Sequence, residues 1–286
     1  MRLVETVGEL RAEVAEQRRA GAGVGLVPTM GALHAGHASL VERARDRHAL
    51  VVASIFVNPL QFERPDDLER YPRDLGRDLA LLERSGAQVC FAPVAKEMYP
   101  DGEPIVRVDP GTIGATLEGA SRPGHFSGVA TVVAKLLCIA TPDAAYFGEK
   151  DFQQLVLVRR LVRDLSMPVD VVGCATVREP DGLATSSRNA RLSVAGRAAA
   201  TVLHRALLAG SAAWRAGGGP GGAETAAAQE VRAEPLATLD YAAAVDDRLT
   251  RLAAPAPATG VTGPFRLLVA ATVDGVRLVD NVEVPS

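Results

Sequence analysis

The feature that most limits the possible folds is an alternation of apolar runs and helical patterns through the first two-thirds of the chain. Apolar runs rich in β-branched residues occupy residues 23–27, 50–57, 88–92, 144–147 and 169–175. Helical patterns occupy residues 38–47, 75–84, 129–139 and 152–165. The runs are continuously apolar, which is typical of parallel strands buried on both faces. The pattern predicts an α/β fold with a Rossmann-like, doubly wound parallel sheet.

The last third of the chain predicts a second, smaller α+β domain. Ser193 is placed to cap an Ala-rich helix that runs to about residue 216, and the glycine run 217–222 is expected to be a surface loop. Asp274-Gly275 predicts a hairpin turn between two closing strands. Strand patterns occupy residues 239–245, 265–273 and 276–284, and a Pro/Gly-rich loop occupies residues 253–263. We place the domain boundary between residues 176 and 177.

Bulk composition excludes several kinds of partner. The 286 residues carry a net charge of −3 with no basic stripe, so nucleic acid is not expected as a partner. No apolar stretch approaches the ~18 residues that a membrane-spanning helix needs, and the first residues are too polar for a signal peptide. Cys90, Cys138 and Cys174 are widely spaced in apolar runs, so we expect buried, reduced thiols and a cytoplasmic location.

A histidine-rich segment follows the first apolar run, where a helix begins. The first N–H groups of a helix have no partner inside it, and its dipole places roughly half a positive charge there, so a polyphosphate is an expected ligand. Gly36 would let a ligand approach the backbone, and His34 and His37, three residues apart, would share one face. Zinc ligation is the alternative, with His125 as the other histidine in a suggestive context.

Two further polar clusters follow later strand patterns. Asn58 and Gln61 flank a proline-containing turn, which could bind a hydroxyl or a carboxylate through Gln61 or could be purely structural. Lys150 offers a compact cation for phosphate after the fourth run, and Gln154 lies one turn into the next helix. Asp151 could hold Mg²⁺ through water, or it could cap that helix.

A third cluster, after the fifth run, is rich in hydrogen-bond donors. Ser186 and Ser187 are adjacent hydroxyls followed by Arg188, a combination suited to a phosphate chain. No Gly-x-Gly-x-x-Gly follows a strand and no lysine-bearing P-loop is present, which argues against ordinary dinucleotide binding and kinase chemistry. No serine lies in a nucleophile elbow, so a Ser/His/Asp hydrolase is also unsupported.

Four motifs taken together resemble the pantothenate synthetases, a family of the nucleotidyltransferase superfamily that carries His-x-Gly-His. They are residues 27–37 (VPTMGALHAGH), 54–62 (SIFVNPLQF), 147–151 (FGEKD) and 186–189 (SSRN). The likeness runs from about Leu3 to Val284 and includes residues 277–281 (RLVDN). The resemblance implies an ATP-dependent condensation of pantoate with β-alanine through pantoyl adenylate, giving pantothenate, AMP and pyrophosphate.

The resemblance also implies roles for the matching residues. The catalytic residues are His34, His37 (as the acid), Lys150, Ser186, Ser187 and Arg188. The ATP-binding residues are Met30, Gly31, Ala32, Leu33, His34, Ala35, Gly36, His37, Gly148, Glu149, Lys150, Asp151, Val177, Thr185, Ser186, Ser187 and Arg188. Gln61 and Gln154 bind pantoate, Gln61 also binds β-alanine, and Asp151 holds Mg²⁺ through water. Residues 1–176 bind the nucleotide and pantoate, residues 177–286 form a lid, and the enzyme is a homodimer.

The chain departs from the family pattern at a few positions. Ala35 stands where the family commonly has glutamate, and we expect its side chain to face away from the nucleotide. Thr185 replaces the usual methionine, which bears on turnover rate more than on reaction type. Arg77 precedes Asp78 where some relatives carry paired acids, so helix 75–84 is left out of the predicted site. The rival interpretations are another nucleotidyltransferase, a non-catalytic nucleotide-binding regulator and a metal hydrolase.

Overall fold

The chain forms two compact units, described here by a computed structural model over residues 1–62, 68–252 and 264–285. Residues 1–149 and 153–175 make up the first unit, and residues 150–152 and 176–286 make up the second. The predicted loop at residues 253–263 lies outside the described residues. Within the described ranges, the structure has no helix that is both long and apolar enough to cross a membrane.

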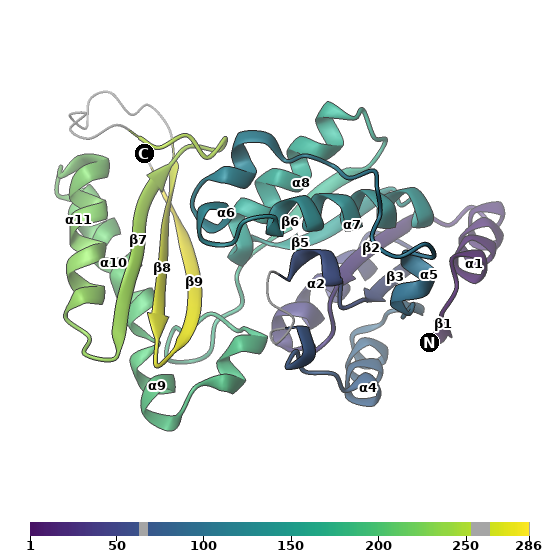
Figure 1. Ribbon diagram of the computed structural model, residues 1–286, viewed down its shortest axis with the longest axis horizontal. Coiled ribbons are helices and arrows are strands. Elements are labelled where there is room, and N and C mark those ends of the chain that lie inside the picture. Colours follow the sequence, from purple (N-terminus) through teal and green to yellow (C-terminus); the bar gives the residue numbers. More distant parts are fainter. Residues whose placement is uncertain (63–67, 253–263, 286) are drawn as a thin grey trace. The chain divides into compact units, whose positions relative to one another are not determined.

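The first unit is built on a six-stranded parallel sheet, which confirms the predicted fold class (Figure 1). The strand order is β1-β4-β3-β2-β5-β6. The strands are β1 (Arg2–Val4), β2 (Val24–Thr29), β3 (Leu50–Ile55), β4 (Val89–Phe91), β5 (Ala144–Gly148) and β6 (Asp170–Cys174). Strand β1 was not predicted, because three residues carry too little periodicity to be recognised. The chain builds outward from β2 on one side and then crosses to β5 on the other, so the strand order reverses between β2 and β5.

Helices cover both faces of this sheet. The side chains of alternate strand residues point to opposite faces, so Leu26 joins the core under α1, α7 and α8, whereas Val27 joins the core under α2 and α4. The helices are α1 (Val7–Arg19), α2 (Ala35–Arg45), α4 (Leu75–Ser85), α7 (His125–Ala140) and α8 (Phe152–Asp164). Shorter elements are η1 (Pro59–Gln61), α5 (Ala95–Met98), η2 (Gly111–Ala115), α6 (Glu118–Ser121) and η3 (Glu149–Asp151).

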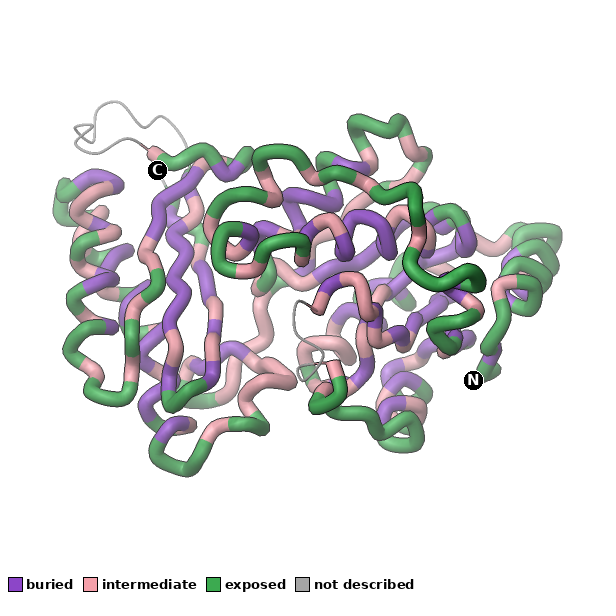
Figure 2. The backbone as a smooth tube through the Cα atoms, in the orientation of Figure 1, coloured by how far each residue is buried: buried purple, intermediate pink, exposed green. Residues whose placement is uncertain are grey.

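The second unit packs helices against a three-stranded antiparallel sheet, whose central strand is largely buried (Figure 2). Asp274 and Gly275 turn the last hairpin at φ values of +49° and +73°, as predicted from their sequence. The strands are β7 (Ala237–Val245), β8 (Phe265–Val273) and β9 (Val276–Val284). The helical elements are η4 (Ser187–Arg191), α9 (Val194–Ala199), α10 (Val202–Arg215) and α11 (Gly219–Arg232).

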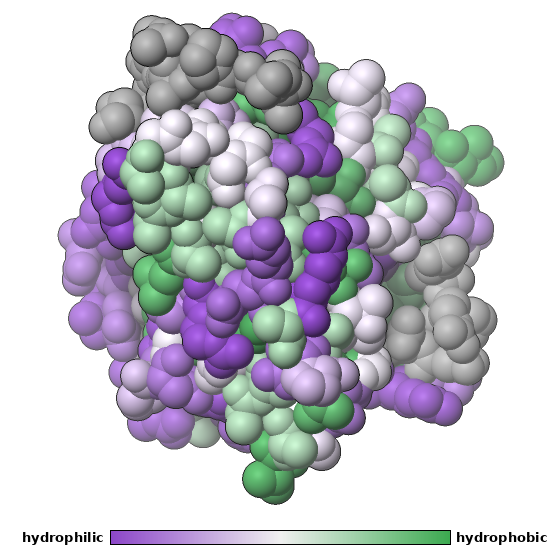
Figure 3. Space-filling model, turned by 90° about the vertical axis from the view of Figure 1, so that its left-hand side faces the viewer, coloured by the Kyte–Doolittle hydropathy of each residue, from purple (hydrophilic) through white to green (hydrophobic). Residues whose placement is uncertain are grey.

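Two predictions for this unit are wrong. The Ala-rich helix capped by Ser193 ends at Ala199, because the Thr201 hydroxyl bonds back to the Ala198 carbonyl and α10 starts separately. The glycine run also does not stay a loop, since α11 begins inside it. Pro220 suits a first helical turn, and the small residues of α11 let it pack closely on α10. The face that carries α11 is a mosaic of hydrophilic and apolar side chains (Figure 3).

The three cysteines are free thiols, as predicted. Cys90 and Cys174 are buried, and burial raises the pKa of the Cys90 thiol to about 12. Cys138 is exposed, contrary to prediction, because it lies on the outward side of α7, whose neighbouring Leu137 and Ile139 face the core. The apolar neighbours of Cys138 in the sequence were therefore not sufficient to predict that Cys138 itself is buried, because adjacent residues of a helix point in different directions.

Candidate active site

Three of the predicted polar clusters follow adjacent strands at the carboxyl edge of the parallel sheet. Thr29 at the end of β2 pairs with Ile55 at the end of β3, and Leu26 of β2 pairs with Ala145 of β5. The loops that leave these three ends carry the histidine segment, the Gln61 turn and Gly148. The carboxyl ends of the neighbouring strands β2 and β5 mark the topological switch point, the place where doubly wound sheets bind their ligands.

His34 and His37 form one unit at the start of α2. His34 is the N-cap, and its Nδ1 accepts a hydrogen bond from the backbone N–H of Gly36 at 3.2 Å. Nδ1 of His37 in turn accepts from the backbone N–H of His34 at 3.3 Å, and the ring centroids lie 4.2 Å apart. A neutral imidazole that accepts at Nδ1 carries its proton at Nε2, so the Nε2–H group of each ring is its donor.

Helix α2 begins at Ala35, three residues before the predicted start. The backbone N–H groups of Gly36 and His37 donate to the Nδ1 atom and the carbonyl oxygen of His34, respectively. The prediction from the sequence was that such N–H groups bind a ligand. Gly36 is needed because a Cβ there would lie 3.0 Å from the His34 ring, not only for ligand approach. Ala35 is exposed. The donors at this helix end are therefore the imidazoles more than the backbone.

Asp78, which the sequence analysis left out of the site, holds the loop before these histidines. Its carboxylate accepts from the backbone N–H groups of Ala32 at 2.9 Å and Leu33 at 2.8 Å, and the residue is only 2% exposed. Gly31 and Ala32 have φ values of +82° and +52°, and the left-handed conformation of Ala32 costs roughly 1–2 kcal/mol. The two hydrogen bonds that the buried carboxylate accepts offset that cost and fix the entry into α2.

The Gln61 side chain is held in a defined orientation. Buried Asn58 donates to Gln61 Oε1 at 3.0 Å and to the Gly128 carbonyl at 3.1 Å. Gln61 Nε2 then donates toward the Met30 sulfur, 2.9 Å away. Tyr99 donates its hydroxyl to Asn58 Oδ1 at 2.9 Å, and burial raises the pKa of Tyr99 to about 12, so it stays protonated. The turn thus has both a structural function and an oriented amide.

His125 supports the same turn from α7. The Arg122 guanidinium donates to His125 Nε2 at 3.0 Å, so the proton lies on Nδ1, which donates to the Gln61 carbonyl at 2.9 Å. Both ring nitrogens are therefore used in protein contacts. Among the described residues, no group of three His, Cys, Asp or Glu side chains could hold a metal ion, so the zinc interpretation has no support there.

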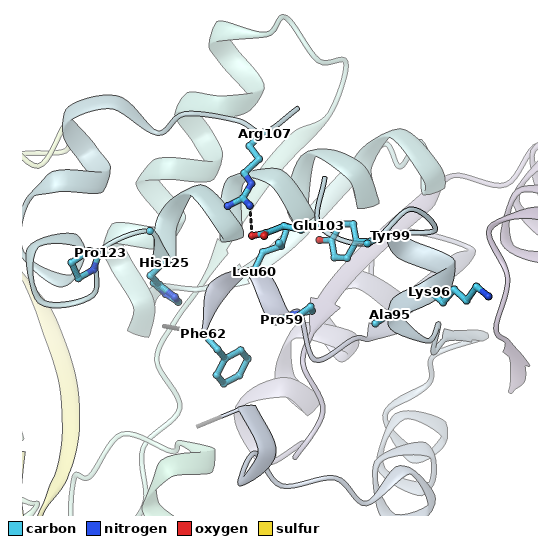
Figure 4. Close-up of a pocket in the computed structure, with 12 residues that line it drawn as sticks. Pro59, Leu60, Phe62, Ala95, Lys96, Tyr99, Glu103, Arg107, Pro123 and His125 are labelled. Carbon is cyan, nitrogen blue, oxygen red and sulfur yellow. Dashed lines mark hydrogen bonds and ion pairs between the residues drawn. The ribbon is translucent and has the colours of Figure 1, made fainter. Parts of the chain in front are cut away.

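A cavity of about 530 Å³ lies beside the Gln61 turn in the first unit (Figure 4). Leu60, Phe62 and His125 line it, and so do Glu103 and Arg107, which form an ion pair beside Leu60. Neither Gln61 nor Gln154 lines this cavity. The cavity therefore lies behind the Gln61 turn, and it is not the predicted pantoate site.

Adjacent glutamines on α8 have different surroundings. Gln153 is buried and bonds to the Glu118 N–H and to the carbonyls of Ile113 and Thr116. Gln154 is half-buried, and its side chain makes no hydrogen bond with any described residue. It is consequently the one of the pair able to bind a ligand.

Lys150 and Asp151 lie side by side in the second unit. The Lys150 side chain is 14% exposed and its Nζ lies 3.4 Å from Asp151 Oδ1. The Asp151 side chain is 51% exposed. A single exposed carboxylate fits the way Mg²⁺ is usually bound, by one or two carboxylates together with water and substrate phosphates.

The predicted hydroxyl-rich loop is the continuation of a short hairpin. The Thr185 N–H bonds to the Val177 carbonyl at 2.9 Å, which brings these two predicted ATP-binding residues together. Ser186 Oγ then accepts from the Arg188 N–H at 3.3 Å and starts η4. The half-buried Arg188 guanidinium has no ion pair or hydrogen bond within the described part of the chain, so it is available for an anionic ligand.

Sequence reasoning missed the residues that orient these groups, namely Asp78, Tyr99 and Arg122. The helix of Asp78 was left out because of the residues at positions 77 and 78, and the segment of Arg122 was considered only for His125 as a zinc ligand. The one available signal was that the acid at position 78 interrupts the apolar face of α4. It required knowledge of which loop that face of α4 covers.

Comparisons with known proteins agree over nearly the whole chain. The family profile described as pantoate–β-alanine ligase matches residues 2–283. The pantothenate synthetase of Leifsonia xyli subsp. xyli is 56% identical over 256 residues, covering 90% of this chain and 87% of the relative. That of Thermus thermophilus is 52% identical over 285 residues, 99% of each protein.

Solved structures give the same result. The crystal structure of pantothenate synthetase from Thermus thermophilus has a TM-score of 0.92 at 52% identity and covers 100% of both chains. A pantoate–β-alanine ligase from Francisella tularensis, described as complexed with β-γ ATP and β-alanine, has a TM-score of 0.79 at 34% identity. That match covers 99% of this chain and 97% of the other.

Proposed function

This chain belongs to the pantoate–β-alanine ligase family, and from that premise we propose that it condenses pantoate with β-alanine at the expense of ATP. A pantoate carboxylate oxygen attacks the α-phosphorus, the bond to the β-phosphate oxygen breaks, and pyrophosphate leaves. The β-alanine nitrogen then attacks the acyl carbon of pantoyl adenylate, an amide forms, and AMP leaves as the nitrogen loses a proton.

The main obstacle to the first step is repulsion between a carboxylate and a polyanionic nucleotide. The Nε2–H groups of His34 and His37 are proposed to donate to phosphate oxygens, with His37 acting as the acid toward the departing pyrophosphate. Lys150, Arg188 and the Ser186 and Ser187 hydroxyls are proposed to bind phosphate as well. The protein supplies no covalent nucleophile, because each substrate brings its own.

The remaining predicted residues take part in binding. Gln61 and Gln154 are proposed to bind pantoate through their amides, and Gln61 to contact β-alanine. The other ATP-binding residues predicted from the sequence are proposed to contact the nucleotide. Asp151 would hold Mg²⁺, which when bound would neutralise phosphate charge. The homodimer, the cytoplasmic location and the role of the second unit as a lid remain proposals supported by the family resemblance.

The observation that carries the proposal is the histidine pair at the switch point, oriented by backbone bonds so that both Nε2–H groups are donors. The test follows pantoate-dependent exchange of labelled pyrophosphate into ATP. The His37→Ala variant should lose ~10²–10³-fold in rate, as expected for removal of one preorganised donor. His48→Ala, a histidine outside the site, is the matched control and should retain exchange.

The same assay separates the rival functions. A regulator that binds nucleotide without catalysis would show no exchange, and another nucleotidyltransferase would exchange with a substrate other than pantoate. Adding β-alanine should give pantothenate and AMP in equal amounts. Exchange that does not depend on pantoate would refute the proposed function.

A further inference from the structure

The motif at residues 277–281 has no role in the proposed reaction, yet two of its polar residues are deeply buried. Asp280 and Asn281, consecutive on β9, are each 3% exposed. Buried charges and amides are costly unless they are fully hydrogen-bonded. The groups that form hydrogen bonds with these two side chains therefore indicate why polar residues are buried at these positions.

Asp280 holds the hairpin that leads to the hydroxyl-rich loop. Arg178 Nη1 lies 2.6 Å from Asp280 Oδ2 and Arg178 Nη2 lies 3.0 Å from Oδ1, a bidentate pair. Arg178 also donates to the carbonyl of Gly182 at 3.0 Å. The Thr185 N–H bond to Val177 closes the same hairpin. The base of the segment that carries Ser186, Ser187 and Arg188 is thus fixed to β9.

Asn281 holds the backbone of Lys150. Its Nδ2 donates to the Lys150 carbonyl at 2.9 Å, and its Oδ1 accepts from Arg266 Nη1 at 3.1 Å. The Arg266 guanidinium lies over the ring of Phe152, 4.7 Å from its centroid. Residues 150–152 are consequently attached to β8 and β9, although the chain before and after them belongs to the first unit.

We propose that Asp280 and Asn281 are positioning residues that fix Lys150 and the loop of Arg188 in one mutual register for binding the triphosphate. The inference rests on the proposed function. Replacing a buried ion pair by apolar residues is often neutral for stability, so geometry is a better reason for this pair than stability. Asp280 and Asn281 are neighbours on β9, so both segments are attached to the rigid core of the same sheet.

The test is a double-mutant cycle on the full-length protein, with pantoate-dependent ATP–pyrophosphate exchange as the assay. Asn281→Asp removes the donor to the Lys150 carbonyl and keeps the acceptor for Arg266. It should slow exchange about tenfold, the value of one lost hydrogen bond. In a Lys150→Ala background the same substitution should have no further effect, because Asn281 acts through Lys150. If the fold-reductions caused by the two single substitutions multiply in the double mutant, the residues act independently and the proposal is overturned.

Asp280→Asn is tested in the same way against Arg188→Ala. Asp240→Asn is its matched control, since Asp240 forms an ion pair with Arg277 of the same sheet. Glu283→Gln is the control for Asn281→Asp, since Glu283 pairs with Arg266 at 3.2 Å. Both controls should leave exchange within about twofold of the original protein.

Two readouts distinguish positioning from general damage. The KM for pantoate should stay unchanged in the Asn281 variant while kcat falls. Aminolysis of purified pantoyl adenylate by β-alanine, which releases no pyrophosphate, should be slowed less than the exchange. Equal losses in both half-reactions would overturn the proposal. Asn281→Thr, neutral and β-branched, repeats the cycle in case the buried carboxylate of Asn281→Asp prevents folding.

Failure of this positioning proposal can be distinguished from failure of the proposed function. If the original protein makes no pantothenate, the proposed function fails. If it makes pantothenate and the cycles are additive, the function stands and the positioning role fails.

Discussion

Asp78 Oδ1 accepts a hydrogen bond from the backbone N–H of Leu33 at 2.8 Å, across 45 residues of sequence. The second oxygen of the same carboxylate accepts from the Ala32 N–H. One buried side chain of α4 therefore fixes the loop that delivers His34 to the start of α2. Elements on the same face of the sheet are coupled here by a single carboxylate, which makes the histidine pair sensitive to a residue outside it.

Asp78→Asn should lower both stability and activity. An asparagine offers one acceptor oxygen and sets its NH₂ group against the other backbone N–H, so a buried donor loses its partner at a cost of ~1–3 kcal/mol. Thermal unfolding and pantoate-dependent exchange measure the two effects. Asp74→Asn on the same helix is the control, because Asp74 caps α4 from an exposed position and asparagine caps equally well. An unchanged exchange rate in Asp78→Asn would contradict the role given to Asp78.

Gln61→Glu should weaken pantoate binding selectively. The new side chain still accepts from Asn58, but it replaces the Nε2 donor by a carboxylate oxygen that repels the pantoate carboxylate. We expect kcat/KM for pantoate to fall by ~10²-fold or more, the range for leaving a recognition group unpaired, with a smaller change in KM for ATP. Steady-state kinetics with each substrate varied measures this. Gln229→Glu, an exposed glutamine on α11, controls for the added charge.

The neighbouring glutamines of α8 should give opposite results. Gln153→Leu breaks three hydrogen bonds between a buried side chain and residues 113–118, and it should lower the free energy of unfolding by about 2–5 kcal/mol. Gln154→Leu should leave stability within ~0.5 kcal/mol, because no described residue depends on its amide. It should raise the KM for pantoate ~10-fold. A normal KM in Gln154→Leu would remove Gln154 from the binding site.

His48 should make stability depend on pH. Burial lowers its pKa from the usual 6.5, with Arg47 acting in the same direction and Asp143 opposing, and its Nε2 lies 2.9 Å from the Tyr146 hydroxyl. The folded protein therefore binds a proton less readily than the unfolded chain. The stability from neutral His48 is complete above about pH 6.5 and is lost as pH falls through the lower folded value.

The measurement compares melting temperatures of the original protein and His48→Gln. His204, whose pKa burial also lowers, contributes to both proteins and cancels in the difference. The advantage of the original protein should be larger at about pH 7.5 than at about pH 5.5. A difference that stays constant with pH would show that His48 does not titrate in this way.

Much of the first unit could be predicted from the sequence because most of its strands are continuous apolar runs. The runs at β2, β3 and β5 were recognised within a few residues, and Asp274-Gly275 determined the last hairpin through its backbone preferences. Strand β1 and the helix inside the glycine run were missed, because one is too short and the other depends on packing against α10.

The chemistry of the candidate site was also local information. His34, His37, Gln61, Lys150 and Arg188 stand in motifs whose order and spacing could be recognised, and the strand ends placed three of them at one edge of the sheet. What could not be predicted is how each is held. Contacts between residues far apart in sequence leave no periodic trace.

The sequence by itself determined the α/β class, the closing hairpin and the set of side chains that carry charge and hydrogen-bond donors. These follow from backbone preferences and from the burial of continuous apolar runs. Only the tertiary structure decided that Asp78 fixes the histidine loop, that Asn58 orients Gln61 and that Asn281 holds Lys150. The physical reason is that a buried polar group must find its partner wherever the packed chain brings one within hydrogen-bonding distance.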